Sequence, residues 1–327
     1  MSQLTPASAP GKLMVSGEYA VLEGAVAIVA SVDVRAYACW CETTDRSPSQ
    51  TASSPQNRPL PPEAVLARRL AEEFAGTVQA ELTIDASDLR RSGKKLGLGS
   101  SAAAAAAAVG AVLATHGHDL SQPACQQKVL ELALAGHKAI APEGSGADVA
   151  AASLGGFVRF QLEGGALAEA RRVSFPKAVT TRIVWTGKEA RTSTFVRAVR
   201  EFEARDAKAY GLIRDRLTEQ ASQFADAIEQ GDTSTIVSAA GGYGRAMGEL
   251  GEAAGVSILT PELKQIAELA ERSGGSAKPS GAGGGDVAIA FFTSETDAAS
   301  FEAACKKAAL EPLDLSLGAP GVQTEVA

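Results

Sequence analysis

The chain is poor in cysteine and has no long apolar run. Four of its 327 residues are cysteine, and their spacing matches no zinc-binding pattern. No apolar stretch reaches the length of a membrane span without a glycine or a charge, and no segment resembles a signal peptide. We therefore expect reduced thiols and a cytoplasmic protein with no membrane partner.

Positive charge is also scarce. The chain has 31 Lys and Arg residues against 38 Asp and Glu residues, which gives a formal net charge of −7. A protein that binds nucleic acid normally presents a basic face, so this balance argues against nucleic acid as the main partner. An anionic small molecule remains possible, because one pocket can be basic on an acidic protein.

Two common nucleotide-binding signatures are missing. A P-loop needs Ser or Thr after its Gly-Lys pair, whereas Gly11-Lys12, Gly93-Lys94 and Gly187-Lys188 are followed by Leu, Lys and Glu. The protein-kinase motifs H-R-D and D-F-G do not occur either. A site for ATP would therefore belong to neither of these classes.

Apolar patterning predicts a mixed fold with a large core, since 45% of the residues are hydrophobic. Strands and helices alternate without a regular βαβ order, which favours an α+β fold over a doubly wound sheet. Strands are predicted at 12–15, 25–32, 35–41, 80–84, 157–161, 180–185 and 287–292, and helices at 64–74, 123–140, 192–230, 233–250, 261–273 and 297–309, with a further helix starting near residue 100.

One polar, proline-rich segment interrupts this pattern. Residues 43–62 read TTDRSPSQTASSPQNRPLPP and have no periodicity. Such a composition cannot bury enough apolar surface to order itself. We expect a mobile surface insert that lies apart from any site.

Residues 96–101 form the most informative segment, a Leu-Gly-Leu-Gly-Ser-Ser loop followed by seven alanines. Alanine is the best helix former, so a helix is predicted to start at this loop. The first turn of a helix attracts anions, and glycines let the backbone approach a ligand closely. The loop therefore suits phosphate, although glycine and serine before a helix are also ordinary turn and cap residues.

Two other segments carry candidate chemistry. Lys12 begins a strand after Gly11, where its ammonium could reach a site or could lie in solvent. Asp148 closes the loop Glu143-Gly-Ser-Gly-Ala-Asp, just before a run of small residues. At that place it could take a proton or hold a metal, or it could cap the following helix.

Residues 278–286 form a third glycine loop, Lys-Pro-Ser-Gly-Ala-Gly-Gly-Gly-Asp. Consecutive backbone N–H groups in such a loop can bind an anion. A flexible connection between a helix and the next strand is the alternative.

Together, these segments resemble the three motifs of the GHMP kinases. They occur in the family's order: PGKLMVSGEYAVLEG, then GLGSSAAAA, then KPSGAGGGD. The resemblance implies two α+β domains, at 1–175 and 176–327, with the active site in the cleft between them. The N-terminal domain would resemble a ribosomal-protein S5-like domain.

The resemblance also implies roles for individual residues. Lys12 and Asp148 stand where family members carry a catalytic lysine and aspartate. The 96–101 loop would wrap the phosphates of ATP, and a serine hydroxyl, assigned to Ser100, would touch Mg²⁺. The implied nucleotide-binding residues are Lys95, Gly97, Leu98, Gly99, Ser100, Ser101 and Ala102, and the implied substrate-binding residues are Lys12, Glu18, Tyr19, Ser145, Ser193, Ser280, Gly281, Ala282 and Gly283.

Within the family, residues 143–156, 185–193, 255–263 and the third motif are most similar to phosphomevalonate kinases. Mevalonate kinases more often have histidine where Tyr19 stands. The implied activity is ATP-dependent phosphorylation of the small molecule 5-phosphomevalonate, by a monomer or a homodimer. A mevalonate kinase remains an alternative. A non-catalytic ligand sensor is another, disfavoured by the presence of Lys12, Ser100 and Asp148.

Overall fold

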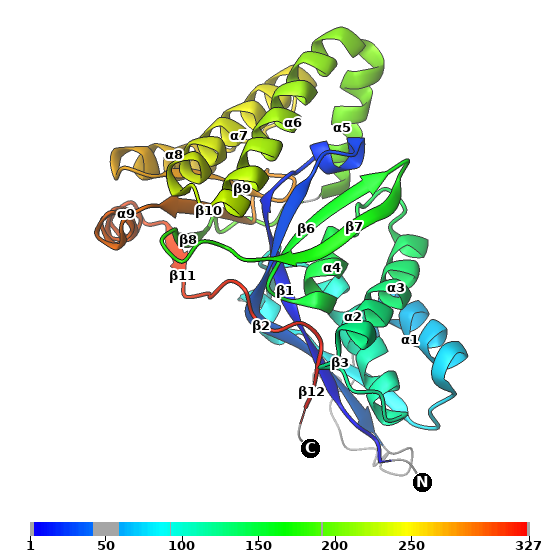
Figure 1. Cartoon of the computed structure of the whole chain (residues 1–327). Coiled ribbons are helices and arrows are strands. Elements are labelled where there is room, and N and C mark those ends of the chain that lie inside the picture. The colour runs from blue at the N-terminus through cyan, green and yellow to red at the C-terminus, as the bar shows by residue number, and fades with distance from the viewer. Residues whose placement is uncertain (1–2, 42–58, 92, 191, 326–327) are drawn as a thin grey trace.

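The computed structural model describes residues 3–41, 59–91, 93–190 and 192–325. Most of the 43–62 insert lies outside the described residues, and its last residue, Pro62, begins a helix. The described residues build two large sheets, each with its own group of helices (Figure 1). A third, two-stranded sheet pairs β4 (Arg90–Arg91) with β5 (Lys94–Lys95).

The first sheet is antiparallel and carries helices on one face. Its strands run in the order β12 (Gln323–Thr324), β1 (Ala7–Ser16), β2 (Ala27–Cys41), β6 (Phe157–Glu163) and β7 (Ala166–Val173), and β3 (Glu81–Asp85) pairs with β2. The helices are α1 (Pro62–Ala75), α2 (Ser100–Thr115), α3 (Pro123–Ile140) and α4 (Ala147–Leu154).

The alanine run explains how α2 sits in the centre of this unit. All seven alanines from Ala102 to Ala108 are fully buried, in contact with other helices and the sheet. Methyl side chains let neighbouring backbones approach closely, whereas larger groups would push them apart. The helix is therefore fixed along its length, and so is the loop from which it starts.

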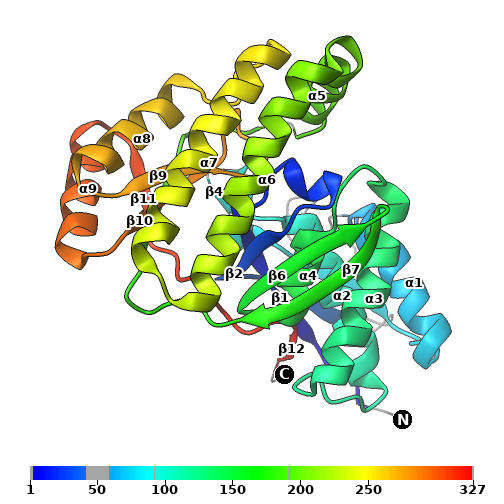
Figure 2. The same cartoon turned by 45° about the horizontal axis from the view of Figure 1, so that its top comes forward.

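The second sheet is also antiparallel. Its strands run in the order β11 (Glu311–Leu313), β8 (Thr180–Trp185), β10 (Val287–Phe292) and β9 (Ser276–Ser280). Its helices are α5 (Thr192–Arg205), α6 (Ala207–Gln230), α7 (Thr233–Ala254), α8 (Pro261–Arg272) and α9 (Glu295–Lys307). The turned view separates this group from α1–α4 (Figure 2).

The chain returns to the first sheet at its C-terminal end. Strand β12 pairs with β1, and the buried Arg35 donates hydrogen bonds to the backbone oxygens of Pro320 and Gly321. Helices α6–α9 each begin at a side-chain cap, as where Thr260 accepts from the N–H of Leu263 ahead of Pro261. Among the described residues, no helix is both long and apolar enough to span a bilayer.

The α+β expectation is confirmed, and the predicted strands and helices occur near their expected positions. Several details differ. Residues 278–280 belong to β9, so the third glycine loop starts later than predicted. The helical stretch 192–230 divides into α5 and α6 at Asp206, which caps α6. The strands predicted at 25–32 and 35–41 form the single strand β2.

The edge strands β7, β11 and β12 were not predicted. The β7 sequence ALAEARRV consists mostly of alanine and charged residues, which are uncommon in strands.

A buried ion pair connects the two units. The Lys278 ammonium on β9 lies 2.5 Å from Oε1 of Glu18, which follows β1, and both side chains are almost fully buried. Burial lowers the pKa of Lys278, and the nearby Glu18 carboxylate acts in the opposite direction. Tyr243 on α7 donates to the backbone oxygen of Glu18. These contacts fix the end of β1 against the second sheet.

Lys278→Met leaves the Glu18 carboxylate buried without its cation. Removing one partner of a buried pair costs about 3–5 kcal/mol, and we expect a loss of this size in the free energy of unfolding, measured with denaturant. The control is Lys306→Met, which breaks the exposed Lys306–Glu302 pair and should change the same quantity by at most about 1 kcal/mol. Equal losses in the two variants would contradict the importance of the buried pair.

Candidate active site

Two cavities lie side by side where the units meet. The first, here called the Tyr19 cavity, has a volume of about 200 Å³ and is lined from β1, the short 3₁₀ helix η1 (Ala20–Glu23), α3, α4, α5 and the 281–282 turn. The second, the Ser100 cavity, has a volume of about 230 Å³ and is lined by the 96–101 loop and the 186–190 turn. Lys12, Asp148 and Thr192 line both. A group in one cavity can therefore meet a group in the other at these residues.

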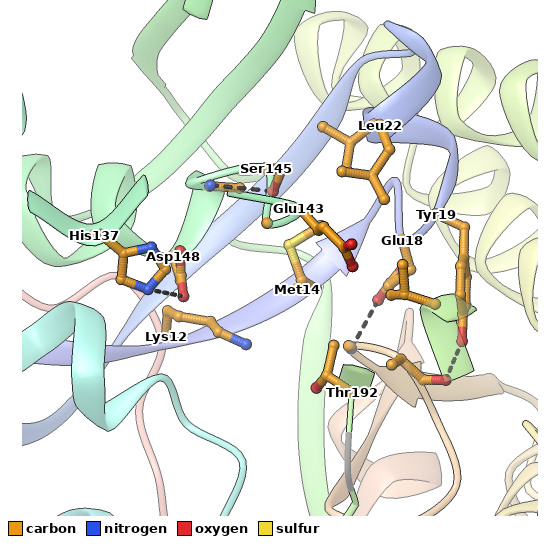
Figure 3. Close-up of a pocket in the computed structure, with 16 residues that line it drawn as sticks. Lys12, Met14, Glu18, Tyr19, Leu22, His137, Glu143, Ser145, Asp148 and Thr192 are labelled. Atoms are coloured by element: carbon orange, nitrogen blue, oxygen red, sulfur yellow. Dashed lines mark hydrogen bonds and ion pairs between the residues drawn. The ribbon is translucent and has the colours of Figure 1, made fainter. Parts of the chain in front are cut away.

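An irregularity in β1 places Lys12 at this junction. The pairing register of β1 with β2 shifts between Pro10 and Lys12, and the Lys12 N–H donates to the Leu98 oxygen at 2.8 Å. Such bulges turn a side chain away from the regular alternation of the strand. The Lys12 ammonium lies 3.5 Å from the Gly97 oxygen and points into the Tyr19 cavity (Figure 3). The backbone and side chain of one residue thus both contact the 96–101 loop.

The 96–101 loop is a tight turn that leads directly into α2. Gly97 and Gly99 both have positive φ, and Gly99 is the N-cap of α2. A Cβ on Gly99 would lie 2.9 Å from the Lys12 side chain. Among the described residues, the hydroxyls of Ser100 and Ser101 have no hydrogen-bond partner and do not cap the helix. The capping alternative holds for Gly99 but is wrong for the two serines, which line the Ser100 cavity.

Asp148 is not the cap of its helix either. Gly146 is the N-cap of α4, and Asp148 stands in the first helical turn. Its Oδ1 accepts from the N–H of Val149 at 3.0 Å, and its Oδ2 lies 3.7 Å from Nε2 of His137. No ion pair within 4.0 Å joins Asp148 to Lys12 in the described part of the chain. The two residues face the same space without touching.

The Tyr19 cavity combines apolar walls with a few fixed polar groups. Tyr19 has a positive φ, and its hydroxyl donates to the Ala282 oxygen at 2.5 Å. Burial, aided by Glu18, raises the pKa of Tyr19, so the hydroxyl stays a donor. Oε1 of Glu18 accepts from the Gly281 N–H, while the buried Oε2 has no hydrogen-bond partner among the described residues. One carboxylate oxygen of a residue that lines the cavity is thus unpaired within the described part of the chain.

The structure brings most of the expected residues together. Lys95, Gly97, Leu98, Gly99, Ser100 and Ser101 line the Ser100 cavity, and Glu18, Tyr19, Ser145, Gly281 and Ala282 line the Tyr19 cavity.

Four expected residues lie elsewhere. Ala102 is fully buried in α2, and Ser280 is buried in β9. A Cβ on Gly283 would meet the Ile258 backbone. Ser193 lines a neighbouring cavity of about 280 Å³ beside Arg197 and Arg200. Ala102, Ser280 and Gly283 line neither the Tyr19 cavity nor the Ser100 cavity, because each is packed within one of the two units.

The structure also adds residues that the sequence did not single out. His137 and Glu143 line the Tyr19 cavity, and Glu189 and Asp286 line the Ser100 cavity. Asp286 ends the third glycine motif, which was a usable signal. His137 gives no such signal, because it is a single histidine in an amphipathic helix and the residue next to it in space, Asp148, belongs to α4.

Carboxylates outnumber ammonium groups around the Ser100 cavity. Lys12 and Lys95 face Asp148, Glu189 and Asp286. Asp286 has positive φ, and its Oδ1 accepts from the Ala190 N–H. Burial raises the pKa of its carboxyl, with that hydrogen bond acting against the shift. A polyanion in this cavity therefore needs further positive charge.

Gly97→Ala tests the close contact between the 96–101 loop and Asp286. The new Cβ would lie 2.5 Å from the Asp286 carboxylate, so one of the two must move. We expect ATP to bind at least about 10-fold more weakly by titration calorimetry, because loop backbone N–H groups shift.

Gly93→Ala is the matched control. Gly93 has nearly the same φ, +79° against +78°, but no atom lies within 4 Å of its added Cβ. ATP affinity should stay within about twofold, since the shared cost is only that of a left-handed alanine. Equal weakening in both variants would show that the contact with Asp286 is unimportant.

Sequence profiles and relatives agree on one family. The profile described as GHMP kinases N terminal domain matches residues 64–156, and the GHMP kinases C terminal profile matches residues 224–310. A phosphomevalonate kinase from Streptomyces sp. (strain CL190) is 29% identical, over 88% of this chain and 89% of the relative. A mevalonate kinase from Aeropyrum pernix is 28% identical, over 89% and 90%.

The fold comparison gives the same result. The structure of Streptococcus pneumoniae phosphomevalonate kinase in complex with phosphomevalonate and AMPPNP superimposes with a TM-score of 0.77 at 22% identity, covering 95% of this chain and 99% of that one. The arrangement of the two large sheets and their helices is thus that of a known fold. The chain belongs to the GHMP kinase family.

Proposed function

We propose that this chain transfers the γ-phosphoryl group of ATP to 5-phosphomevalonate, giving 5-diphosphomevalonate and ADP. The observation that carries the proposal is the sharing of Lys12, Asp148 and Thr192 by two adjoining cavities. ATP phosphates would occupy the Ser100 cavity, and the acceptor would occupy the Tyr19 cavity. An oxygen of the acceptor phosphate would attack the γ-phosphorus, and the bond to the β–γ bridging oxygen would break.

Lys12 is the group best placed to act on the transferred phosphoryl. Phosphoryl transfer depends mainly on positioning and on neutralising charge. The Lys12 ammonium is directed to the junction of the cavities, where it would contact the acceptor phosphate and the γ-phosphate together. Its backbone N–H holds Leu98, so any shift of the loop also moves the lysine.

Asp148 has the smaller share in this mechanism. The second pKa of a phosphate monoester is about 6, so the acceptor oxygen is largely deprotonated at neutral pH. Asp148 would take a proton from the remaining protonated acceptor and would orient groups at the junction. Since Asp148 makes no ion pair with Lys12, we assign it no direct role in positioning the lysine side chain.

The donor atoms of the Ser100 cavity suit Mg²⁺. This ion prefers oxygen ligands and is usually bound by one or two carboxylates together with substrate phosphates. Ser100 offers a free hydroxyl, and Asp148, Glu189 and Asp286 supply carboxylates around the same space. When bound, Mg²⁺ would neutralise phosphate charge that Lys12 and Lys95 cannot balance by themselves.

The choice of acceptor rests on segments outside the 96–101 loop. Tyr19 stands where mevalonate kinases more often have histidine, and its hydroxyl braces the Ala282 turn over the acceptor. The relative from Streptomyces that matches over most of the chain is a phosphomevalonate kinase. The similar identity of an archaeal mevalonate kinase keeps mevalonate as the second candidate acceptor.

Replacing Lys12 tests the reaction centre. Losing one charge-stabilising contact typically lowers turnover by about 100- to 1000-fold. We expect a fall of at least this size for Lys12→Met, a smaller fall for Asp148→Asn, and for Lys95→Met mainly a raised KM for ATP. Steady-state kinetics of the purified variants measure all three. Near-normal kcat in Lys12→Met would remove Lys12 from the mechanism.

A coupled assay of ADP release tests the acceptor. With 5-phosphomevalonate the chain should turn over with a kcat/KM at least about 100-fold above that for mevalonate, equivalent to about 2.7 kcal/mol. Turnover with mevalonate and none with its 5-phosphate would make the chain a mevalonate kinase. Tight binding of both ligands without ADP release would identify a sensor instead.

A further inference from the structure

His137 lies next to Asp148, and its ring has no other side-chain partner within the described part of the chain. It stands in the last turn of α3, and Asp148 stands in the first turn of α4. The distance from Nε2 to Oδ2 is 3.7 Å, and Figure 3 shows the ring facing the carboxylate. The Nδ1 atom is buried without a hydrogen-bond partner among the described residues. The single polar contact of this buried ring is therefore with Asp148.

The surroundings of Asp148 explain why such a contact matters. One carboxylate oxygen is bound by the Val149 N–H, and Lys12 is not within ion-pair distance. The free rotation of the carboxyl group is thus limited on one side by backbone and on the other by His137. The Asp148 side chain is 25% exposed, whereas the His137 side chain is 8% exposed. The more buried ring is the fixed partner, and the carboxylate is the one that it orients.

We propose that His137 is a positioning residue for Asp148, holding Oδ2 with its Nε2–H and so setting the direction in which the carboxylate faces the acceptor. The proposal rests on the kinase site described above, but not on which acceptor is used. A contact of 3.7 Å is longer than a hydrogen bond, and catalytic contacts of this kind often shorten only when substrate is bound. Misplacing a reacting group by about 1 Å costs about 100-fold in rate, which sets the possible size of the effect.

Other charged groups face the same cavity. Lys12 comes from β1, Glu18 from the segment after β1, and Glu143 from the loop before α4. Lys138 follows His137, but its ammonium donates to the Gly165 oxygen. In the described residues, none of these forms an ion pair within 4.0 Å of His137. Asp148 is therefore the partner through which a change at His137 would act.

A double-mutant cycle separates positioning from a purely structural role. We expect His137→Leu to lower kcat about 10- to 100-fold with little change in the KM for ATP. This loss of kcat should not exceed the loss caused by Asp148→Asn. In the Asp148→Asn background, His137→Leu should cause no further loss, because the residue it acts on has already been changed. His137→Gln, which keeps a donor near the Nε2 position, should recover most of the lost kcat.

The control is His116→Leu. His116 also ends a helix, but its Nε2 contacts the Gly76 oxygen, outside both cavities. This variant should keep the kcat of the unaltered chain, and thermal unfolding of every variant checks that it is folded. The cycle uses whichever of 5-phosphomevalonate or mevalonate the unaltered chain phosphorylates.

The outcomes are distinct. Independent, multiplicative losses in the double variant would overturn the proposal, as would a kcat of His137→Gln as low as that of His137→Leu. An unaltered chain that turns over mevalonate contradicts the proposed acceptor while leaving the cycle informative. An unaltered chain that phosphorylates neither acceptor contradicts the proposed function, and with it any role of His137 in turnover.

Discussion

The buried contact between Glu18 and Lys278 is the constraint on which the rest of the site depends. It joins the end of β1 to β9, strands of two different sheets, and the same carboxylate accepts from the Gly281 N–H. A buried pair gives little net stability, but it becomes costly to break once formed. Its value here lies in positioning, because the turn at 281–282 and Glu18 and Tyr19 after β1 both line the Tyr19 cavity and are hydrogen-bonded to each other.

Lys12 transmits this constraint to the second cavity. The irregularity in β1 frees its N–H from the strand pairing and directs it to Leu98, so the 96–101 loop is attached to the strand that ends two residues before Glu18. Strand β1 therefore carries the lysine at the junction and the anchor of the loop, and it leads directly to the contact between the units. A rigid element of this kind suits phosphoryl transfer, which depends on holding two anionic groups in line.

The sequence predicted the elements better than their contacts. Apolar runs located β8 and β10, and the alanines located α2, because burial over a whole element leaves a local pattern. The last three residues of β9, Lys-Pro-Ser, were predicted as loop, since the partner of the buried Lys278, Glu18, lies 260 residues away in the sequence. His137 was missed for the same reason, as its partner belongs to another helix. The capping explanation for Asp148 fails because the cap is Gly146, two positions earlier, and the sequence does not fix a helix start to within two residues.

The central claim is that one lysine serves both cavities at once. A crystal structure of this chain with Mg²⁺, a non-hydrolysable ATP analogue and 5-phosphomevalonate tests it most directly. The account predicts the γ-phosphate in the Ser100 cavity and the acceptor phosphate in the Tyr19 cavity, with the Lys12 ammonium in contact with both and the reacting atoms about 3–3.5 Å apart. An acceptor bound outside the Tyr19 cavity, or a Lys12 ammonium in contact with only one phosphate, would contradict it.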